Sequence, residues 1–208
     1  YMTTHKFMIE DVRFHLNDPK KVIFVGWYYD GSTKNHTLAV RLDNRELPVE
    51  LLINRGVEVC QKYIHSVNEI SEEVVGIVAL PDNWELSHTL TIETSYKGTW
   101  HKDASYSTAK LKKIKNRIQY GIDNVKRTEN RIIVNGCCIG NGEIKLALLD
   151  EKKQPVHVKS DHFYKADTER IGPEDEKREK MFFTLQTENV NEKKFYIEMR
   201  SAESVVRV

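Results

Sequence analysis

Aromatic side chains are the first candidates for chemistry in this sequence. Trp27 and Tyr29 follow Gly26 at the end of an apolar run, and Trp84 and Trp100 fall in predicted turn or linker segments. Flat aromatic rings stack on the apolar face of a pyranose, and their polar edges bond to its hydroxyl groups. We therefore predict Trp27, Tyr29, Trp84 and Trp100 as ligand-binding residues. The alternative is packing, with Trp27 in a sandwich core and with Trp84 and Trp100 over a sandwich end.

A run of lysines is the second candidate site. Its members are Lys110, Lys112, Lys113 and Lys115. Such a run attracts the phosphates of a polyanionic glycopolymer, a lipid-linked acceptor or a membrane surface. Leu111 and Ile114 interleave with the lysines, which equally describes a linker or a strand with one solvated face. Contact with a polyanion and simple solvation are both retained as interpretations.

Metal binding and nucleophilic catalysis have less support. His157, Asp161 and His162 carry metal-binding atoms, but a strand would place them on different faces and no fourth ligand is near. Cys137 and Cys138 are adjacent and lack Cys-x-x-Cys spacing, which favours buried thiols. We predict no catalytic residue, no metal and no cofactor in this chain.

The overall charge gives no sign of a nucleic-acid partner. The sequence has 32 basic and 31 acidic residues, so its net charge is +1. Three cysteines make no disulfide framework and favour a reducing compartment. No apolar run approaches the roughly 20 residues that cross a bilayer. We therefore expect a cytoplasmic protein, and we also consider a place at the inner face of the membrane.

A repeated apolar run organises the elements that must position these residues. Residues 22–30, VIFVGWYYD, return in weaker form as residues 132–140, IIVNGCCIG. Each run reaches a glycine and continues with bulky or sulfur-bearing residues, as a buried strand does where its backbone bends. Similar lead-ins precede both runs, at residues 7–12 and 120–125. We interpret the chain as a tandem duplication of one domain.

Short alternating segments separated by turns fill most of both halves. Leu38, Val40 and Leu42 fall on one face of a predicted strand, and Pro48 indicates an edge strand or a strand start. Residues 54–71 and 163–180 are predicted as helical or looped crossovers, and residues 96–116 as a linker. The sequence therefore predicts an all-β fold of two tandem immunoglobulin-like antiparallel β-sandwiches, residues 1–112 with the linker and residues 113–208.

The order of these motifs resembles a known bacterial region. The residues that carry the resemblance are Ile9-Glu10-Asp11-Val12 with Gly26-Trp27, Tyr120-Gly121-Ile122-Asp123-Asn124-Val125 with Gly136, and Tyr164-Lys165-Ala166-Asp167. The chain is similar to the tandem β-sandwich accessory modules of family 2 glycosyltransferases that build surface polysaccharides in Firmicutes. These modules commonly precede the catalytic domain, and they usually carry arginine where Lys165 stands.

The resemblance implies a non-catalytic accessory region that positions a bacterial glycosyltransferase or its glycan acceptor in cell-surface polysaccharide synthesis. A nucleotide-sugar transferase needs a strand, glycine-rich turn and helix unit and an Asp-x-Asp cluster, and the sequence has neither. Sugar transfer would then belong to an adjoining domain, and we expect this chain to be part of a longer protein. The alternative is a free-standing carbohydrate-binding or adhesin-like surface module.

The expected partners follow from the same resemblance. They are the adjoining glycosyltransferase domain, a glycan or glycolipid acceptor and a second copy of the chain. Nucleic acid is not expected as a partner.

Overall fold

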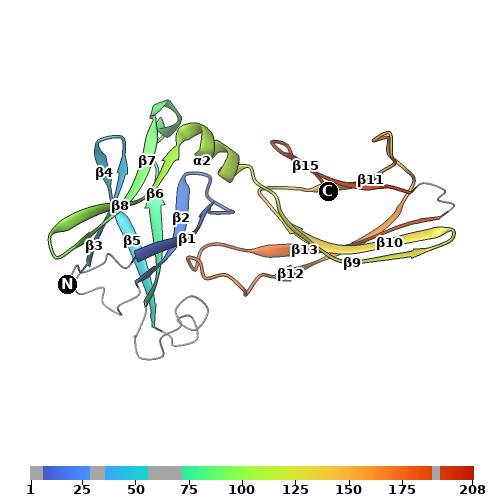
Figure 1. Ribbon diagram of the computed structural model, residues 1–208, viewed down its shortest axis with the longest axis horizontal. Helices are drawn as coiled ribbons and strands as arrows, with labels where there is room; N and C mark the ends of the chain where they lie inside the picture. The colour runs from blue at the N-terminus through green and yellow to red at the C-terminus, as the bar shows by residue number, and fades with distance from the viewer. Residues whose placement is uncertain (1–6, 29–35, 56–71, 189–192) are drawn as a thin grey trace. The chain divides into compact units, whose positions relative to one another are not determined.

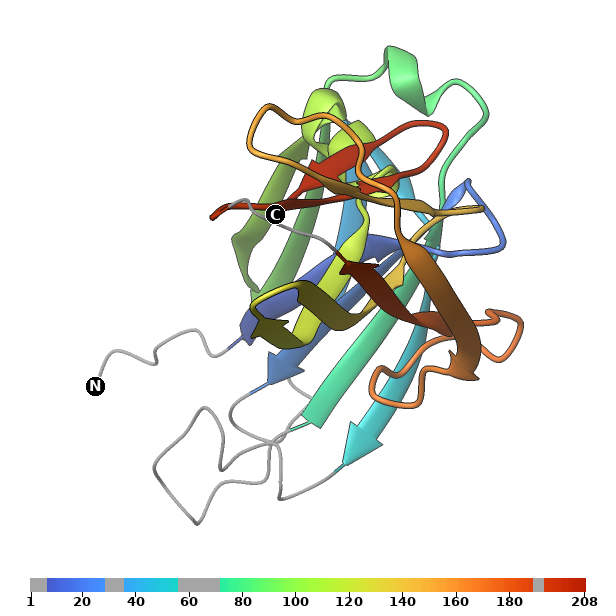
Figure 2. The same cartoon turned by 90° about the vertical axis from the view of Figure 1, so that its right-hand side faces the viewer.

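The computed structural model describes residues 7–28, 36–55, 72–188 and 193–208. These residues form four antiparallel sheets that pack as two β-sandwiches (Figures 1 and 2). The chain divides into two compact units. Tyr1–Lys115 with Ile171–Glu174 make unit 1, and Asn116–Arg170 with Asp175–Val208 make unit 2. The predicted all-β class and the antiparallel sandwiches are confirmed.

Unit 1 is a sandwich of two four-stranded sheets. Sheet A has the order β1-β2-β6-β5, with bounds Phe7–Phe14, Lys21–Tyr28, Glu72–Ala79 and Val49–Arg55. Sheet B has the order β4-β3-β7-β8, with bounds Arg45–Leu47, His36–Leu42, Thr89–Tyr96 and Thr99–Ser107. A 3-10 turn, η2 (Trp84–Leu86), and a helix, α2 (Thr108–Lys115), also belong to this unit.

Unit 2 is a sandwich of a four-stranded and a three-stranded sheet. Sheet C has the order β12-β13-β10-β9, with bounds Lys159–Ala166, Glu179–Glu188, Arg131–Ile139 and Gln119–Thr128. Sheet D has the order β11-β14-β15, with bounds Lys145–Leu149, Tyr196–Arg200 and Val205–Arg207. Figure 1 shows β11 and β15 in one layer of this unit and β9, β10, β12 and β13 in the other.

Each sandwich has its own apolar core. In unit 1, Phe24 of sheet A is fully buried in a cluster that also contains Leu111 of α2. In unit 2, Leu185 of sheet C and Met199 of sheet D are fully buried in one cluster. The β3 residues predicted to share a face all meet the unit 1 core: Leu38, Val40 and Leu42. Burial of apolar surface between the sheets is thus the main force that holds each unit together.

Pro48 marks the place where the chain passes between the two sheets of unit 1. β4 ends at Leu47 in sheet B, and β5 begins at Val49 in sheet A. Proline has no N–H to donate to a strand ladder, so it fits the break between the two strands. The predicted strand start after Pro48 is confirmed, and β5 lies at an edge of its sheet.

Two segments predicted to lack strands contain them. The expected linker, residues 96–116, holds β8, which pairs with β7, and the helix α2. The expected second crossover, residues 163–180, begins inside β12, which pairs with β13. Both strands lie at sheet edges and expose most of their residues, so they lack the apolar alternation that marks a half-buried strand. Residues 56–71 of the other expected crossover lie outside the described residues.

A glycine with no room for a side chain stands in the second strand of each unit. A Cβ atom at Gly26 of β2 would overlap the Phe7 ring. A Cβ atom at Gly136 of β10 would lie 2.6 Å from the Gly121 carbonyl oxygen and 2.7 Å from Cζ of Phe183. Glycine in a strand interior commonly marks such a close approach. Both glycines therefore let a phenyl ring lie against the strand.

A one-residue β-bulge faces each of these glycines. In β1 the register shifts at Glu10, next to the pair Ile9–Gly26, and in β9 it shifts at Asp123, next to the pair Ile122–Gly136. A bulge bends its strand and re-aims the side chain of the extra residue. Because the extra residue is acidic in both units, each unit turns one carboxylate toward the same position relative to its glycine.

We predict that Gly136→Ala lowers the free energy of unfolding of unit 2 by about 2 kcal/mol, because the new methyl group meets a backbone oxygen that cannot move away cheaply. Gly140→Ala is the control, since its nearest neighbour would be Cδ1 of Ile144 at 3.4 Å. Native-state hydrogen exchange of the β10 and β13 amides measures the effect in unit 2. Equal protection in the two variants would contradict the close approach at Gly136.

Candidate functional site

The aromatic residues predicted from the sequence occupy different environments. The Trp27 ring is buried, and its Nε1–H donates to Oε2 of Glu10 at 2.7 Å. Strand alternation places Trp27 on the face of sheet A that points away from the core, opposite Tyr28. Tyr29 lies outside the described residues. Packing and the Glu10 hydrogen bond account for Trp27, whose ring is too buried to offer a stacking face.

The other two tryptophans also differ from each other. Trp84 is buried in the unit 1 core, with its ring centroid 5.7 Å from that of Phe14. Trp100 of β8 is 48% exposed, and the Arg41 guanidinium lies 6.0 Å from the centre of its ring. Arg41 in turn donates to Glu93 at 3.0 Å. Of the three described tryptophans, Trp100 alone presents a ring to solvent.

The predicted lysine run lies on the helix α2. Leu111 is buried and Ile114 packs against the same core, so the helix has an apolar side and a basic side. The ammonium group of Lys112 is 3.6 Å from Glu85, and the ammonium group of Lys110 lies 5.1 Å from the ring centre of Tyr106. Lys113 is exposed, and the ammonium group of Lys115 lies 5.9 Å from the ring centre of Trp84. The run is thus the solvated side of a helix that is anchored in unit 1.

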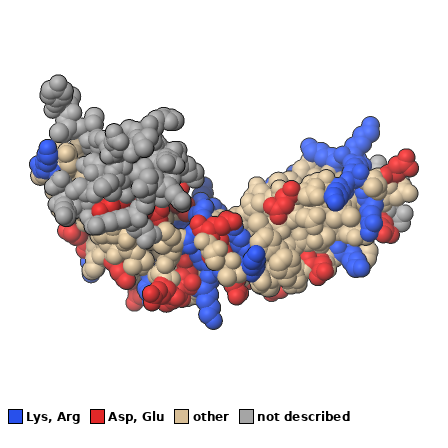
Figure 3. Space-filling model, turned by 90° about the horizontal axis from the view of Figure 1, so that it is seen from below, with Lys and Arg blue, Asp and Glu red and all other residues tan. Residues whose placement is uncertain are grey.

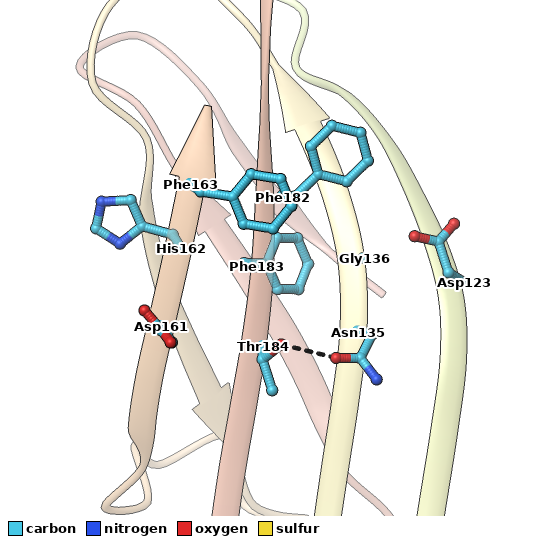
Figure 4. Close-up of a pocket in the computed structure, with 9 residues that line it drawn as sticks. All are labelled: Asp123, Asn135, Gly136, Asp161, His162, Phe163, Phe182, Phe183 and Thr184. Carbon is cyan, nitrogen blue, oxygen red and sulfur yellow. Dashed lines mark hydrogen bonds between the residues drawn. The ribbon is translucent and has the colours of Figure 1, made fainter. Parts of the chain in front are cut away.

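A hollow of about 210 Å³ lies on the outer face of sheet C, entirely within unit 2. Figure 4 shows its centre, where Phe163 of β12 and Phe182 of β13 lie next to each other. Their ring planes are 12° apart and their centroids are 5.2 Å apart, an offset-stacked geometry. A second hollow of about 250 Å³ includes Gly121 and Cys137. We call the two hollows together the sheet C groove.

The strand register arranges the outer face of sheet C as rows of side chains. One row is polar and contains Asp161, Thr184, Asn135 and Asn124. The next row contains Phe163, Phe182, Cys137 and Gly121. Lys165 pairs with Lys180 in a third row. Because strand residues two apart share a face, these rows lie side by side across the sheet.

The polar row has unused hydrogen-bonding capacity. The Thr184 hydroxyl donates to Oδ1 of Asn135 at 2.7 Å, which leaves the Asn135 amide group with its N–H donors (Figure 4). Asp161 and the bulge residue Asp123 also line the groove. Within the described part of the chain, neither carboxylate forms a hydrogen bond or an ion pair. The groove therefore combines stacked phenyl rings with hydrogen-bond donors and acceptors that are spread across the sheet.

The corresponding face of unit 1 is filled. In sheet A the pair Met8–Trp27 stands where sheet C has Gly121–Cys137. The Trp27 indole bonds to the bulge residue Glu10, whereas the equivalent Asp123 meets a hollow. Replacement of one large pair by a small pair opens the groove in unit 2.

Charged residues close one end of the groove. The Asp167 side chain is 2% exposed, and its Oδ2 accepts from the Arg178 guanidinium at 3.1 Å. Burial alone would raise the pKa of Asp167, but the Glu169 N–H, Arg178 and Lys180 together lower it below its ordinary value. The hydrogen bond to Glu169 and the charge of Asp167 raise the pKa of Lys180. This end of the groove thus has fixed, fully ionised groups at neutral pH.

The adjacent thiols have different surroundings. Cys137 is half-buried and lines the groove, while Cys138 is buried in the unit 2 core. Burial, and next the neighbouring Cys137, raise the pKa of Cys138 to about 11. The prediction of a buried thiol is therefore confirmed for Cys138. Cys137 is a small side chain that leaves the hollow open.

Sequence reasoning missed the sheet C groove because its residues were divided among weaker interpretations. From the sequence, Asp161 and His162 are candidates only as metal ligands, and Phe163 falls in a predicted crossover. Within the described ranges, no group of three or more His, Cys, Asp or Glu side chains could hold a metal ion. The spacing Asp161, Phe163, Lys165 is the signal that could have shown one face of an edge strand.

Figure 3 shows that uncharged atoms dominate the visible face of unit 2, with Lys and Arg gathered toward its right-hand edge.

No helix in the described part of the chain is both long and apolar enough to span a membrane. No family model matches the chain, and no curated protein matches it significantly.

We predict that Asp167→Asn destabilises unit 2 by about 3 kcal/mol at pH 7, because the buried Arg178 guanidinium loses the negative charge of Asp167. The folded-state pKa of Asp167 is depressed, so its contribution is complete above the unfolded value of about 3.9 and is lost as the pH falls through the folded value. The difference in the free energy of unfolding between Asp167→Asn and the unchanged protein should therefore become smaller at acidic pH. Glu169→Gln is the control, since its side chain is 78% exposed.

Hydrogen exchange of β13 amides at pH 7 and below pH 4 tests this prediction. A destabilisation that does not depend on pH would contradict an ionised Asp167 as its source.

Proposed function

We propose that this chain is a non-catalytic accessory region of a bacterial glycosyltransferase of cell-surface polysaccharide synthesis, and that it holds the glycan acceptor on unit 2. The sheet C groove carries this proposal. Stacked phenyl rings beside an amide and two carboxylates match a pyranose, which has an apolar ring face and a rim of hydroxyl groups. All the residues that line the two hollows belong to unit 2.

The strand order supports an immunoglobulin-like assignment for both units. Named A to G along the chain, an immunoglobulin constant-type sandwich has strands A, B, E and D in one sheet and C, F and G in the other. Unit 2 has this order, with β9-β10-β13-β12 facing β11-β14-β15. Unit 1 has the same order with β4 as one added strand next to β3. The shared order also supports a duplication.

Three partners follow from this proposal. They are an adjoining family 2 glycosyltransferase domain, a glycan or glycolipid acceptor and a second copy of the chain. Under the proposal the region works in the cytoplasm or at the inner face of the membrane. The lysines of α2 and the exposed Trp100 would then be secondary contacts with the acceptor.

The groove favours one alternative function as well. A site formed by one sandwich alone would also serve a free-standing carbohydrate-binding or adhesin-like surface module. The coding sequence that adjoins residues 1 and 208 separates the two. An adjoining transferase domain supports the accessory function, and an export signal with a surface anchor supports the alternative.

We predict that the chain binds immobilised bacterial surface glycans and that Phe163→Ala weakens this binding about tenfold, because one stacking ring is lost. Phe163 is 62% exposed, so the fold should persist. Tyr164→Ala is the matched control, since Tyr164 is a neighbouring exposed aromatic outside the groove. Equal binding by the two variants on a glycan array would contradict this site.

Cys137→Trp should abolish the same binding, because an indole would fill the groove as Trp27 fills its counterpart in unit 1. Gly121 leaves space for it, since even a Cβ atom there would be 3.6 Å from Sγ of Cys137. Amide spectra of unit 2 check that the variant is folded. Full binding by a folded Cys137→Trp protein would exclude the groove as the glycan site.

A further inference from the structure

Rows of opposite charge flank the aromatic row of the sheet C groove. Asp161 belongs to the polar row on one side of the Phe163–Phe182 pair, and Asp123 lies at the same side in the bulge of β9. Lys165 and Lys180 form the row on the other side. Consecutive rows are separated by two residues along the strand, or about 7 Å. A ligand over the phenyl rings is therefore within reach of carboxylates on one side and ammonium groups on the other.

The basic side can accept an anion. Lys165 is exposed and, within the described part of the chain, makes no ion pair or hydrogen bond. The Lys180 ammonium is 2.7 Å from Glu169 and 3.6 Å from Asp167, which fix its position beside the groove. Asp167 is itself neutralised by Arg178. An anion that bridges Lys165 and Lys180 would relieve the repulsion between these two paired lysines.

The acidic side excludes an anion and accepts hydroxyl groups. Asp123 and Asp161 would repel a phosphate or a carboxylate but can each accept hydrogen bonds from sugar hydroxyls. The Asn135 amide adds donors between them. The two sides together fix the orientation of a ligand whose one end is anionic and whose other end is neutral.

We propose that the sheet C groove selects a sugar residue that bears an anionic group, a phosphate or a carboxylate, with the ring over Phe163 and Phe182 and the anion at Lys165 and Lys180. This inference rests on the proposed function, since it names the class of glycan that the groove takes. The aromatic row binds the ring, the Lys165–Lys180 pair binds the anion, and Asp161 on the same strand as Phe163 receives hydroxyl groups.

The test is a titration of the isotope-labelled chain, followed through the amide signals of β12 and β13, with glucose, glucose 6-phosphate, glucuronic acid and inorganic phosphate. Glucose 6-phosphate or glucuronic acid should bind about fivefold more tightly than glucose, as one exposed ion pair allows. The preference should fall at high salt. Comparison of the two acidic sugars distinguishes phosphate from carboxylate as the source of the anion.

Lys165→Gln should remove most of this preference and leave glucose binding unchanged. Lys159→Gln is the matched control, because Lys159 lies on the same strand and face, beyond the polar row. It should keep the preference.

Different failures have different meanings. Equal binding of glucose and the acidic sugars in the groove would overturn this inference and leave the proposed function standing. Binding of inorganic phosphate as tight as that of glucose 6-phosphate would show a simple anion site and overturn the inference. No shift of groove amides with any sugar would overturn the inference and remove the support for the proposed function.

Discussion

The close approach of a phenyl ring to a strand glycine, opposite a one-residue bulge, is the constraint on which the site depends. Gly26 and Gly136 have no space for a Cβ atom, and the bulge beside each adds one acidic residue. In each unit, the phenyl ring that packs against the glycine and the bulge that directs the acidic side chain therefore lie at the same point of the sheet. The proposed binding surface of unit 2 adjoins the same feature that closes its core.

The two units use this common frame differently. Around the bulge of unit 1, Val25, Val75 and Leu52 form an apolar outer face, and Trp27 bonds to Glu10. The equivalent row of unit 2 is polar and faces a hollow. A duplicated domain can keep its buried positions while its outer face changes, because the inner and outer faces alternate along each strand. Under the proposed function, unit 2 is the copy that binds glycan and unit 1 has a structural role.

The sequence predicts well those elements whose residues alternate between core and solvent. β3 and the strand start after Pro48 follow from periodicity and from the missing N–H of proline. The same reasoning does not predict β12 and β8, because an edge strand with exposed residues has no apolar alternation to detect. The face on which Trp27 lies depends on strand register and on the bulge at Glu10, which residue types alone do not reveal.

The groove was visible in the sequence only as a difference between its two copies. Alignment of residues 132–140 with residues 22–30 places Cys137 at the position of Trp27. The matching change of Met8 to Gly121 becomes visible only through the strand pairing. Phe163 and Phe182 lie on different strands and meet only through the antiparallel register of β12 and β13. Contacts of this kind come from tertiary structure rather than from local pattern.

Intermolecular nuclear Overhauser effects between a bound acidic oligosaccharide and the aromatic protons of the chain test the central claim most directly. The account predicts contacts from the sugar ring protons to Phe163 and Phe182 of sheet C. Contacts to Trp100 of sheet B without any to these two rings would contradict it.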